Sequence, residues 1–183
     1  MSQRGIVKYS YLALLSQPAA DRPIYRELRQ HPVRRIVEIG IGSAVRAQRM
    51  IELLASLQPG RDLHYTGVDL FEARPAEQAG ISLKTAHTLL RPLPAQIKLL
   101  PGPPGDALQR WANELIGTDL LLVAADQDPQ SMARAWPFVP RMLHEQSRVM
   151  CERTTSGSVR FERLDRAEIN LLSSPRRRGR DVA

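Results

Sequence analysis

The sequence predicts an α/β domain in which a mostly parallel, doubly wound sheet carries helices on both faces. Short apolar runs alternate along the chain with segments of helical periodicity, and this order is typical of parallel sheets. The strand expected at residues 119–124 is continuously apolar from Leu120 onward, as expected of a strand that is covered on both faces. Few residues follow the fifth apolar run, so we expect the sheet to be shortened at its C-terminal end.

The N-terminal part of the chain is predicted to be helical and to lead into the first strand. Residues 1–32 form this helical lead-in, where Asp21 is placed to cap a helix and Pro23 fits the first turn of that helix. The apolar run at residues 35–39 then stops abruptly at two glycines. A strand that ends in a tight turn is the simplest interpretation of this pattern.

Two helices and a second strand are expected next along the chain. Ser43 is placed to cap a helix that continues to about Leu57. The second strand is expected at residues 64–69, and Ser82 is placed to cap a further helix over residues 82–90.

The C-terminal half repeats the alternation of strands and helices. Helical periodicity surrounds Trp111 and returns from Ser131 onward, between strands expected at residues 97–100, 119–124 and 147–152. The last apolar segments form either a hairpin around Asp165–Arg166 or a strand followed by a helix, and they lie at residues 159–164 and 167–172.

Length and composition indicate one domain of ordinary globular type in the cytoplasm. The hydrophobic fraction is 43% and the charged fraction 25%, and no apolar run approaches the ~20 residues that a membrane span needs. There is no signal-peptide pattern, and the single Cys151 cannot form an internal disulfide. We expect the domain to span residues 33–172, with a basic tail at residues 173–183.

The basic residues are mostly arginine, and their excess over the acidic residues gives the chain a net charge of +7. The densest cluster lies in the tail, at Arg176–Arg178 and Arg180. It is either a segment that binds nucleic acid or an acidic partner, or a solvated end. The second interpretation is favoured because no aromatic residues accompany the arginines, so nucleic acid is an unlikely partner and no membrane partner is expected.

A glycine turn marks the expected ligand site. Ligands of doubly wound sheets bind beyond the carboxyl ends of the strands, where helix N-termini offer free N–H groups. Val45 stands where the dinucleotide fingerprint needs a small residue, and the acidic Glu38 would repel a pyrophosphate. A nicotinamide dinucleotide is therefore disfavoured. The polar residues and glycines that this edge collects are Glu38, Gly40, Gly42, Asp69, Gly102, Asp106, Asp126 and Asp128.

The segment Glu38-x-Gly40-x-Gly42-x-Ala44 resembles the first motif, (D/E)-x-G-x-G-x-G, of the class I S-adenosylmethionine-dependent methyltransferases. The resemblance extends over residues 33–153 and implies a Rossmann-like fold that binds S-adenosylmethionine. It places Glu38 under the methionine part of the cofactor and puts Gly40, Gly42 and Ser43 in the cofactor-binding turn. Ala44 departs from the motif, because the family has a third glycine there.

Two further acidic residues match cofactor-binding positions of that family. Asp69, at the end of the second strand, matches the residue that accepts hydrogen bonds from both ribose hydroxyls. Asp106 matches the acidic position near the adenine amino group, although another alignment places Gly102 at that strand end.

Asp126 and Asp128 are the candidate catalytic residues. The segment Asp126-Gln127-Asp128 resembles the D-G-D that follows the fourth strand in small-molecule methyltransferases. These carboxylates are candidates for a general base or, together with Glu152, for holding a divalent cation. Alternatively, they only form a helix-start turn, and no metal site is predicted.

Five other residues are weaker candidates for a functional role, and most of them are better explained by packing or by exposure to solvent. His87 and His144 are weak candidates for a general base, and Cys151 is expected to serve packing rather than to act as a nucleophile. Trp136 is a candidate for a partly exposed residue that faces the substrate. Arg74 is available for an anionic group but is expected to be a solvated loop residue.

The sequence thus predicts an S-adenosylmethionine-dependent methyltransferase that acts on a small molecule. The alternative is a non-catalytic module that binds S-adenosylmethionine or a nucleotide and kept the fold without turnover. An RNA- or protein-directed methyltransferase is supported only by the positive charge. A shortened sheet edge would also be a natural place for a homo-oligomer to form.

Overall fold

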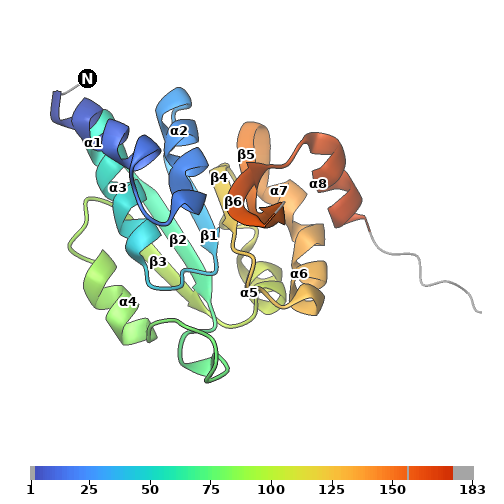
Figure 1. The fold of residues 1–183 in the computed structure, drawn as a ribbon. Helices are drawn as coiled ribbons and strands as arrows, with labels where there is room; N and C mark the ends of the chain where they lie inside the picture. The colour runs from blue at the N-terminus through green and yellow to red at the C-terminus, as the bar shows by residue number, and fades with distance from the viewer. Residues whose placement is uncertain (1–2, 156, 175–183) are drawn as a thin grey trace, which may run out of the picture.

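The computed structural model describes residues 3–155 and 157–174, which form one six-stranded sheet between two layers of helices (Figure 1). The strand order is β3-β2-β1-β4-β5-β6. All neighbouring strands are parallel except β5 and β6, which are antiparallel. The strands are β1 (Arg35–Ile39), β2 (His64–Asp69), β3 (Gln96–Pro101), β4 (Thr118–Val123), β5 (Leu143–Thr155) and β6 (Ser158–Arg163). The predicted doubly wound, mostly parallel sheet is confirmed.

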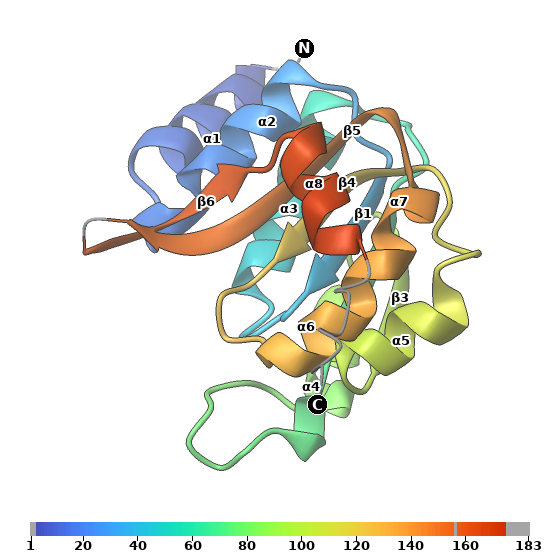
Figure 2. The same ribbon diagram turned by 90° about the vertical axis from the view of Figure 1, so that its right-hand side faces the viewer.

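The helices divide between the two faces of the sheet (Figures 1 and 2). On one face lie α1 (Gln3–Leu14), η1 (Ala19–Asp21), α2 (Arg22–Gln30), α3 (Val45–Leu57) and α4 (Leu83–Leu90), with η2 (Phe71–Ala73) after β2. On the other lie α5 (Pro104–Trp111), α6 (Pro129–Ala135), η3 (Trp136–Phe138), α7 (Val139–Met142) and α8 (Arg166–Ser173). Alternate residues of β1 supply both cores: Ile36 belongs to the first hydrophobic cluster, whereas Val37 and Ile39 belong to the second.

The structure corrects the expected cap of α3. Ser43 does not cap this helix; the N-cap is Ala44, which has a φ of 62° and makes no side-chain cap hydrogen bond. The turn therefore ends in a left-handed residue, a conformation that glycine adopts more easily than alanine. Ser82 does cap α4 as expected, because its hydroxyl accepts a hydrogen bond from the Thr85 amide at 3.0 Å.

The C-terminal segments form a strand and a helix, which confirms the second of the two arrangements that the sequence left open and rules out the hairpin around Asp165–Arg166. β6 pairs with the long β5 instead, and α8 follows it. The reason is a capping box: Asp165 accepts a hydrogen bond from the amide of Glu168, and the Glu168 side chain accepts one from the amide of Asp165. This reciprocal pair starts a helix where a hairpin would need a turn.

The edge strand β6 is short and carries charged side chains at Arg160, Glu162 and Arg163. Charges on an edge strand oppose its pairing with another sheet. The arginine cluster of the tail lies outside the described residues. None of the described helices is long and apolar enough to cross a lipid bilayer.

Candidate functional site

The glycine turn between β1 and α3 contains three residues with positive φ. Gly40 has a φ of 86°, Gly42 of 59° and Ala44 of 62°. A Cβ built on Gly40 would lie 2.7 Å from the Cβ of Ala124, whereas one built on Gly42 would meet no atom within 4 Å. Gly40 thus allows the turn to pack against the end of β4, and Gly42 faces open space.

The two glycines should therefore respond differently to alanine. We expect Gly42→Ala to lower the free energy of unfolding by about 1 kcal/mol, which is the cost of the left-handed backbone alone. Gly40→Ala should cost about 3 kcal/mol, because the contact with Ala124 adds to that strain. Urea denaturation of both variants measures the difference, and equal losses would contradict it.

Asp69 ties the glycine turn to the end of β2. Its carboxylate accepts hydrogen bonds from the amides of Ile41 at 2.7 Å, Gly42 at 3.3 Å and Phe71 at 2.9 Å. Burial alone would raise the pKa of Asp69, but hydrogen bonds from Arg74 and Phe71 outweigh it and hold the pKa below its ordinary value. The residue is therefore a carboxylate at neutral pH.

Arg74 pairs with this carboxylate and is not the solvated residue that the sequence suggested. Its Nε donates to Asp69 at 2.8 Å, its Nη2 donates to the second oxygen, and its Nη1 donates to the carbonyl of Ala79 at 2.6 Å. The same Nη1 lies 3.4 Å from Asp126. Only 7% of the Arg74 side chain is exposed, because the loop after η2 folds over it.

Glu38 lies beneath the turn and is fully buried. Arg46 donates to it at 2.6 Å and Tyr65 at 2.5 Å, so both carboxylate oxygens have protein partners. Arg46 also donates to the carbonyl of Gly40 at 3.0 Å and to Asp21 at 3.3 Å. The sequence predicted that the Asp21 side chain caps α2, and this prediction is wrong. The side chain makes no cap hydrogen bond and joins this buried network instead.

Burial raises the pKa of both acids in this network, Glu38 and Asp21, although Arg46 opposes the shift. One guanidinium thus serves two buried carboxyl groups. The contact between Glu38 and the methionine part of a cofactor stays a prediction, since Glu38 is covered in this structure.

A cavity of about 680 Å³ lies at the carboxyl ends of the strands. It adjoins the turn through Asp126 and Gln127, whose side chains lie against Gly40, although neither Glu38 nor residues 40–44 line it. Asp126 is 45% exposed and accepts a hydrogen bond from the Gln127 side chain at 2.7 Å. Asp128 caps α6 by accepting the Ser131 amide at 2.7 Å, which is the structural alternative considered for this segment. The side chains and backbone that line the cavity come from Asp69, Leu70, Arg74, Pro75, Gln78, Pro103, Pro104, Ala125, Asp126, Gln127, Asp128, Pro129, Ser131 and Arg134.

Asp106 is not among the residues that line this cavity. It lies in the first turn of α5, is half exposed, and forms an ion pair with Arg134 at 3.3 Å. Gly102 follows β3 directly instead, with a φ of 125° and open space around its would-be Cβ. The structure thus places Gly102, rather than Asp106, at the strand end, as the alternative alignment had it.

The other candidates are directed elsewhere. Glu152 accepts the Ala125 amide at 3.0 Å, and the described residues contain no group of three or more His, Cys, Asp or Glu side chains that could hold a metal ion. His144 pairs with Asp119 at 2.9 Å, at the start of β5. Burial raises the pKa of the Cys151 thiol to about 12, and Trp136 is buried in the core rather than exposed to a substrate.

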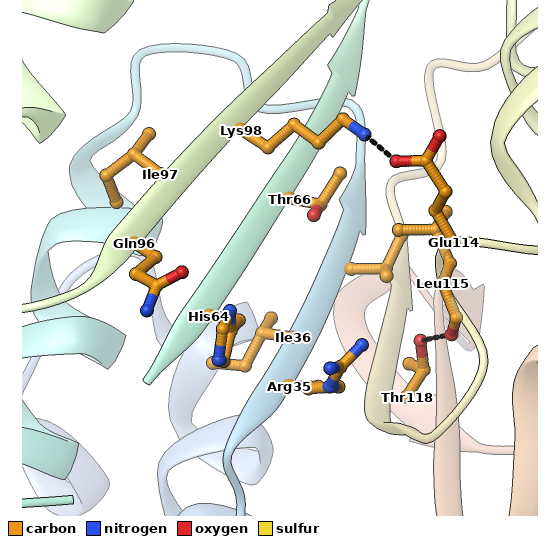
Figure 3. Close-up of a pocket in the computed structure, with 11 residues that line it drawn as sticks. Arg35, Ile36, His64, Thr66, Gln96, Ile97, Lys98, Glu114, Leu115 and Thr118 are labelled. Carbon is orange, nitrogen blue, oxygen red and sulfur yellow. Dashed lines mark hydrogen bonds and ion pairs between the residues drawn. The ribbon is translucent and has the colours of Figure 1, made fainter. Parts of the chain in front are cut away.

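A second hollow of about 430 Å³ lies at the opposite, amino-terminal ends of the strands (Figure 3). Arg35, His64 and Gln96 line it from three neighbouring strands. Its lysine, Lys98, is paired with Glu114 at 2.6 Å and stacks on the Trp111 ring at 3.7 Å. None of the predicted site residues lies in this hollow, so the cavity beside the glycine turn remains the candidate site.

Sequence-based reasoning assigned no role to Arg46, and it considered Arg74 only for an anionic ligand and not as the partner of Asp69. Arg46 stands eight residues after Glu38, and Arg74 stands five after Asp69, spacings that mark no contact on a single helix or strand. The turn after β1 brings Arg46 to Glu38, and the turn after β2 brings Arg74 to Asp69. Arg46 had one local signal, its place in the first turn of the helix that follows the glycines.

Solved structures of other proteins share the fold of this chain, although comparisons of its sequence find no match. No protein-family model and no curated protein matches the sequence. A TehB-like S-adenosylmethionine-dependent methyltransferase from Corynebacterium glutamicum matches with a TM-score of 0.52 and 12% identity, over 93% of this chain and 79% of that one. A methyltransferase from Podospora anserina, solved with S-adenosylhomocysteine, matches with a TM-score of 0.50 and 16% identity, over 82% of this chain and 62% of that one.

A methyltransferase from the mycinamycin biosynthetic pathway matches with a TM-score of 0.44 and 16% identity, over 84% of this chain. The chain spans only 34% of that protein. At these identities the likeness concerns the fold. The chain therefore has the Rossmann-like methyltransferase fold that the resemblance of its glycine motif predicted.

Proposed function

We propose that this protein binds S-adenosylmethionine in the cavity beside the glycine turn and transfers its methyl group to a small molecule. The observation that carries the proposal is the juxtaposition of an open glycine turn, a strand-end carboxylate and a cavity at one sheet edge. The Podospora anserina methyltransferase, which has the same fold, was solved with S-adenosylhomocysteine, the product of such a transfer.

The cavity fits the chemistry of this cofactor. Its apolar lining, including Leu70, Pro103 and Ala125, suits an adenine ring. Its charged lining consists of the three carboxylates Asp69, Asp126 and Asp128 and the two guanidinium groups of Arg74 and Arg134, so it carries one net negative charge. A site of this sign favours a cationic sulfonium over an anionic nucleotide.

The chain's own residues have separate tasks in this proposal. The bound cofactor supplies an electrophilic methyl group, and the protein mainly positions the acceptor. Asp126 is half exposed on the cavity, so it is placed to take a proton from the attacking group. We assign Asp128 to hold the start of α6 rather than to carry a proton.

Calorimetric titration with S-adenosylmethionine and S-adenosylhomocysteine tests the proposal. We expect micromolar binding by the wild type and at least tenfold weaker binding by Ala125→Phe, because this exposed alanine lines the cavity. Val159→Phe places the same ring on exposed β6 and is the control. Absence of binding by the folded wild type would overturn the proposal, and so would equal binding by all three proteins.

One observation favours a second candidate, a module that binds without turnover. All three acids that the resemblance assigns to the cofactor, Glu38, Asp69 and Asp106, are paired with arginines in this structure. A protein that binds S-adenosylmethionine but methylates no acceptor across a broad panel of small molecules would support this candidate.

A further inference from the structure

The carboxylate of Asp69 is saturated with hydrogen bonds. A carboxylate offers about four lone-pair positions on its two oxygens. Asp69 accepts from five N–H groups: the amides of Ile41, Gly42 and Phe71, and the Nε and Nη2 of Arg74. No further donor can bind this carboxylate until one of these leaves.

Only Arg74 can leave without taking the fold apart. The three amides belong to the glycine turn and to the buried start of η2, and their positions are set by the backbone. Arg74 belongs to the segment between η2 and α4, where residues 75–80 are all exposed. This segment projects away from the sheet (Figures 1 and 2). Residues 75–80 belong to neither hydrophobic cluster, and the core contact of the segment is made by Ile81 at its end, so residues 75–80 can move while Ile81 stays packed.

The segment is built around the Arg74 side chain. The Ala79 carbonyl accepts from Nη1 at 2.6 Å. A Cβ on Gly80 would lie 2.7 Å from both Cδ and Nε of Arg74, so the absence of a side chain at this position makes room for the guanidinium. The ends of the segment are held together, because the Leu83 amide donates to Glu72 at 2.9 Å. Arg74 is thus held from both sides in a defined position.

We propose that Arg74 is a displaceable latch that occupies the diol position of the cofactor site. This inference rests on the proposed function. Arg74 presents two N–H groups to Asp69, where a ribose would present two vicinal hydroxyls, so protein and ligand compete for the same acceptor atoms. The site takes a nucleoside with an intact cis-diol only when the latch opens.

Opening the latch also changes the charge of the cavity. While Arg74 is paired, it neutralises Asp69 and lies 3.4 Å from Asp126. When it leaves, Arg134 is the only guanidinium that remains in the lining, beside three carboxylates. The open state therefore attracts a cationic nucleoside more strongly than the closed state does.

Two variants open the latch by different routes. Arg74→Met removes both the donors and the charge. Gly80→Ala keeps Arg74 but fills the space that its side chain occupies, and the backbone φ at this glycine is not in the positive region. Arg153→Met is the matched control, because it removes an arginine that lies outside this lining and pairs with Glu168 rather than with Asp69.

Calorimetry on the full chain with S-adenosylhomocysteine, adenosine and 2′,3′-dideoxyadenosine measures the effect. We expect Arg74→Met to bind the first two at least tenfold more tightly, equivalent to about 1.4 kcal/mol, and Gly80→Ala about threefold. Arg153→Met should stay within twofold of the wild type. Dideoxyadenosine should gain nothing in any variant, because it lacks the two hydroxyls.

The outcomes separate this inference from the proposed function. If the wild type binds and Arg74→Met binds equally or more weakly, the latch is overturned and the cofactor site stands. A gain that dideoxyadenosine shares, or that Arg153→Met reproduces, also overturns the latch, since such a gain depends neither on the diol nor on the pair between Arg74 and Asp69. If no protein in the set binds S-adenosylhomocysteine, the proposed function falls and the latch falls with it.

Discussion

Replacement of Arg46 by methionine is expected to lower the free energy of unfolding by about 3–5 kcal/mol at pH 7, the usual cost of breaking a buried ion pair. Methionine keeps most of the side-chain volume, so the loss reports charge rather than packing. Two carboxyl groups, Glu38 and Asp21, would remain buried without their shared counter-charge. Urea denaturation followed by circular dichroism measures the change.

The pH dependence of this variant follows from the buried acids. Their pKa values are raised in the folded protein, so their protonated forms are favoured by folding. Such groups contribute most to stability below their unfolded pKa, near 4, and this contribution is lost as the pH rises through the folded pKa. The deficit of Arg46→Met should therefore shrink steadily as the pH is lowered from 7 towards 4.

Two further variants test whether the loss of stability comes from the buried charges. Arg153→Met removes an arginine from a pair with Glu168 at 3.3 Å, in which both side chains are about 40% exposed, and should cost less than about 1 kcal/mol. Adding Glu38→Gln to Arg46→Met should recover about 1–3 kcal/mol, because the amide carries no charge. A loss below 1 kcal/mol for Arg46→Met, or no recovery in the double variant, would contradict a buried ionic network.

The order of strands and helices was predictable because hydrophobic periodicity and turn residues act locally. The alternating apolar runs predicted β1 to β5, and the Ser82 cap predicted the start of α4. The ends of the chain were harder to interpret. Asp165 begins a helix through a capping box, yet the same residues also fit a turn, and only the pairing of β6 with β5 decides between them.

The edge of the sheet at which the site lies was predictable, but the partners of its acids were not. Glu38, Asp69 and Asp126 were expected at the carboxyl ends of neighbouring strands, and they lie there. A chain with 26 basic residues offers many possible counter-charges, and sequence alone does not rank them. Asp106 shows a further difficulty, because the motif can be aligned with the strand end in two ways. Gly102 follows β3 directly and α5 begins at Pro104, so Asp106 lies four residues beyond Gly102, in the first turn of the helix and away from the strand end.

Replacement of Asp69 by asparagine is expected to lower the free energy of unfolding by about 2–4 kcal/mol at pH 7, since buried donors lose a charged acceptor. The three amides of Ile41, Gly42 and Phe71 converge on this side chain, and an amide nitrogen cannot accept from them. Arg74 would lose its principal partner as well. Asp126→Asn is the control: it lies on the same cavity but is 45% exposed and should cost less than about 1 kcal/mol.

The acid dependence of the Asp69 variant should differ from that of the Arg46 variant. Asp69 has a lowered pKa in the folded protein, so its contribution is complete above the unfolded pKa, near 4, and is lost as the pH falls through the folded value. The deficit of Asp69→Asn should stay constant from pH 7 to about 5 and shrink only below 4. Because the two deficits respond in different pH ranges, denaturation at pH 7, 5 and 3.5 separates the buried network under the turn from the carboxylate that faces the cavity. A deficit for Asp69→Asn that already falls between pH 7 and 5 would mean that Asp69 is not held as a carboxylate by Arg74 and the three amides.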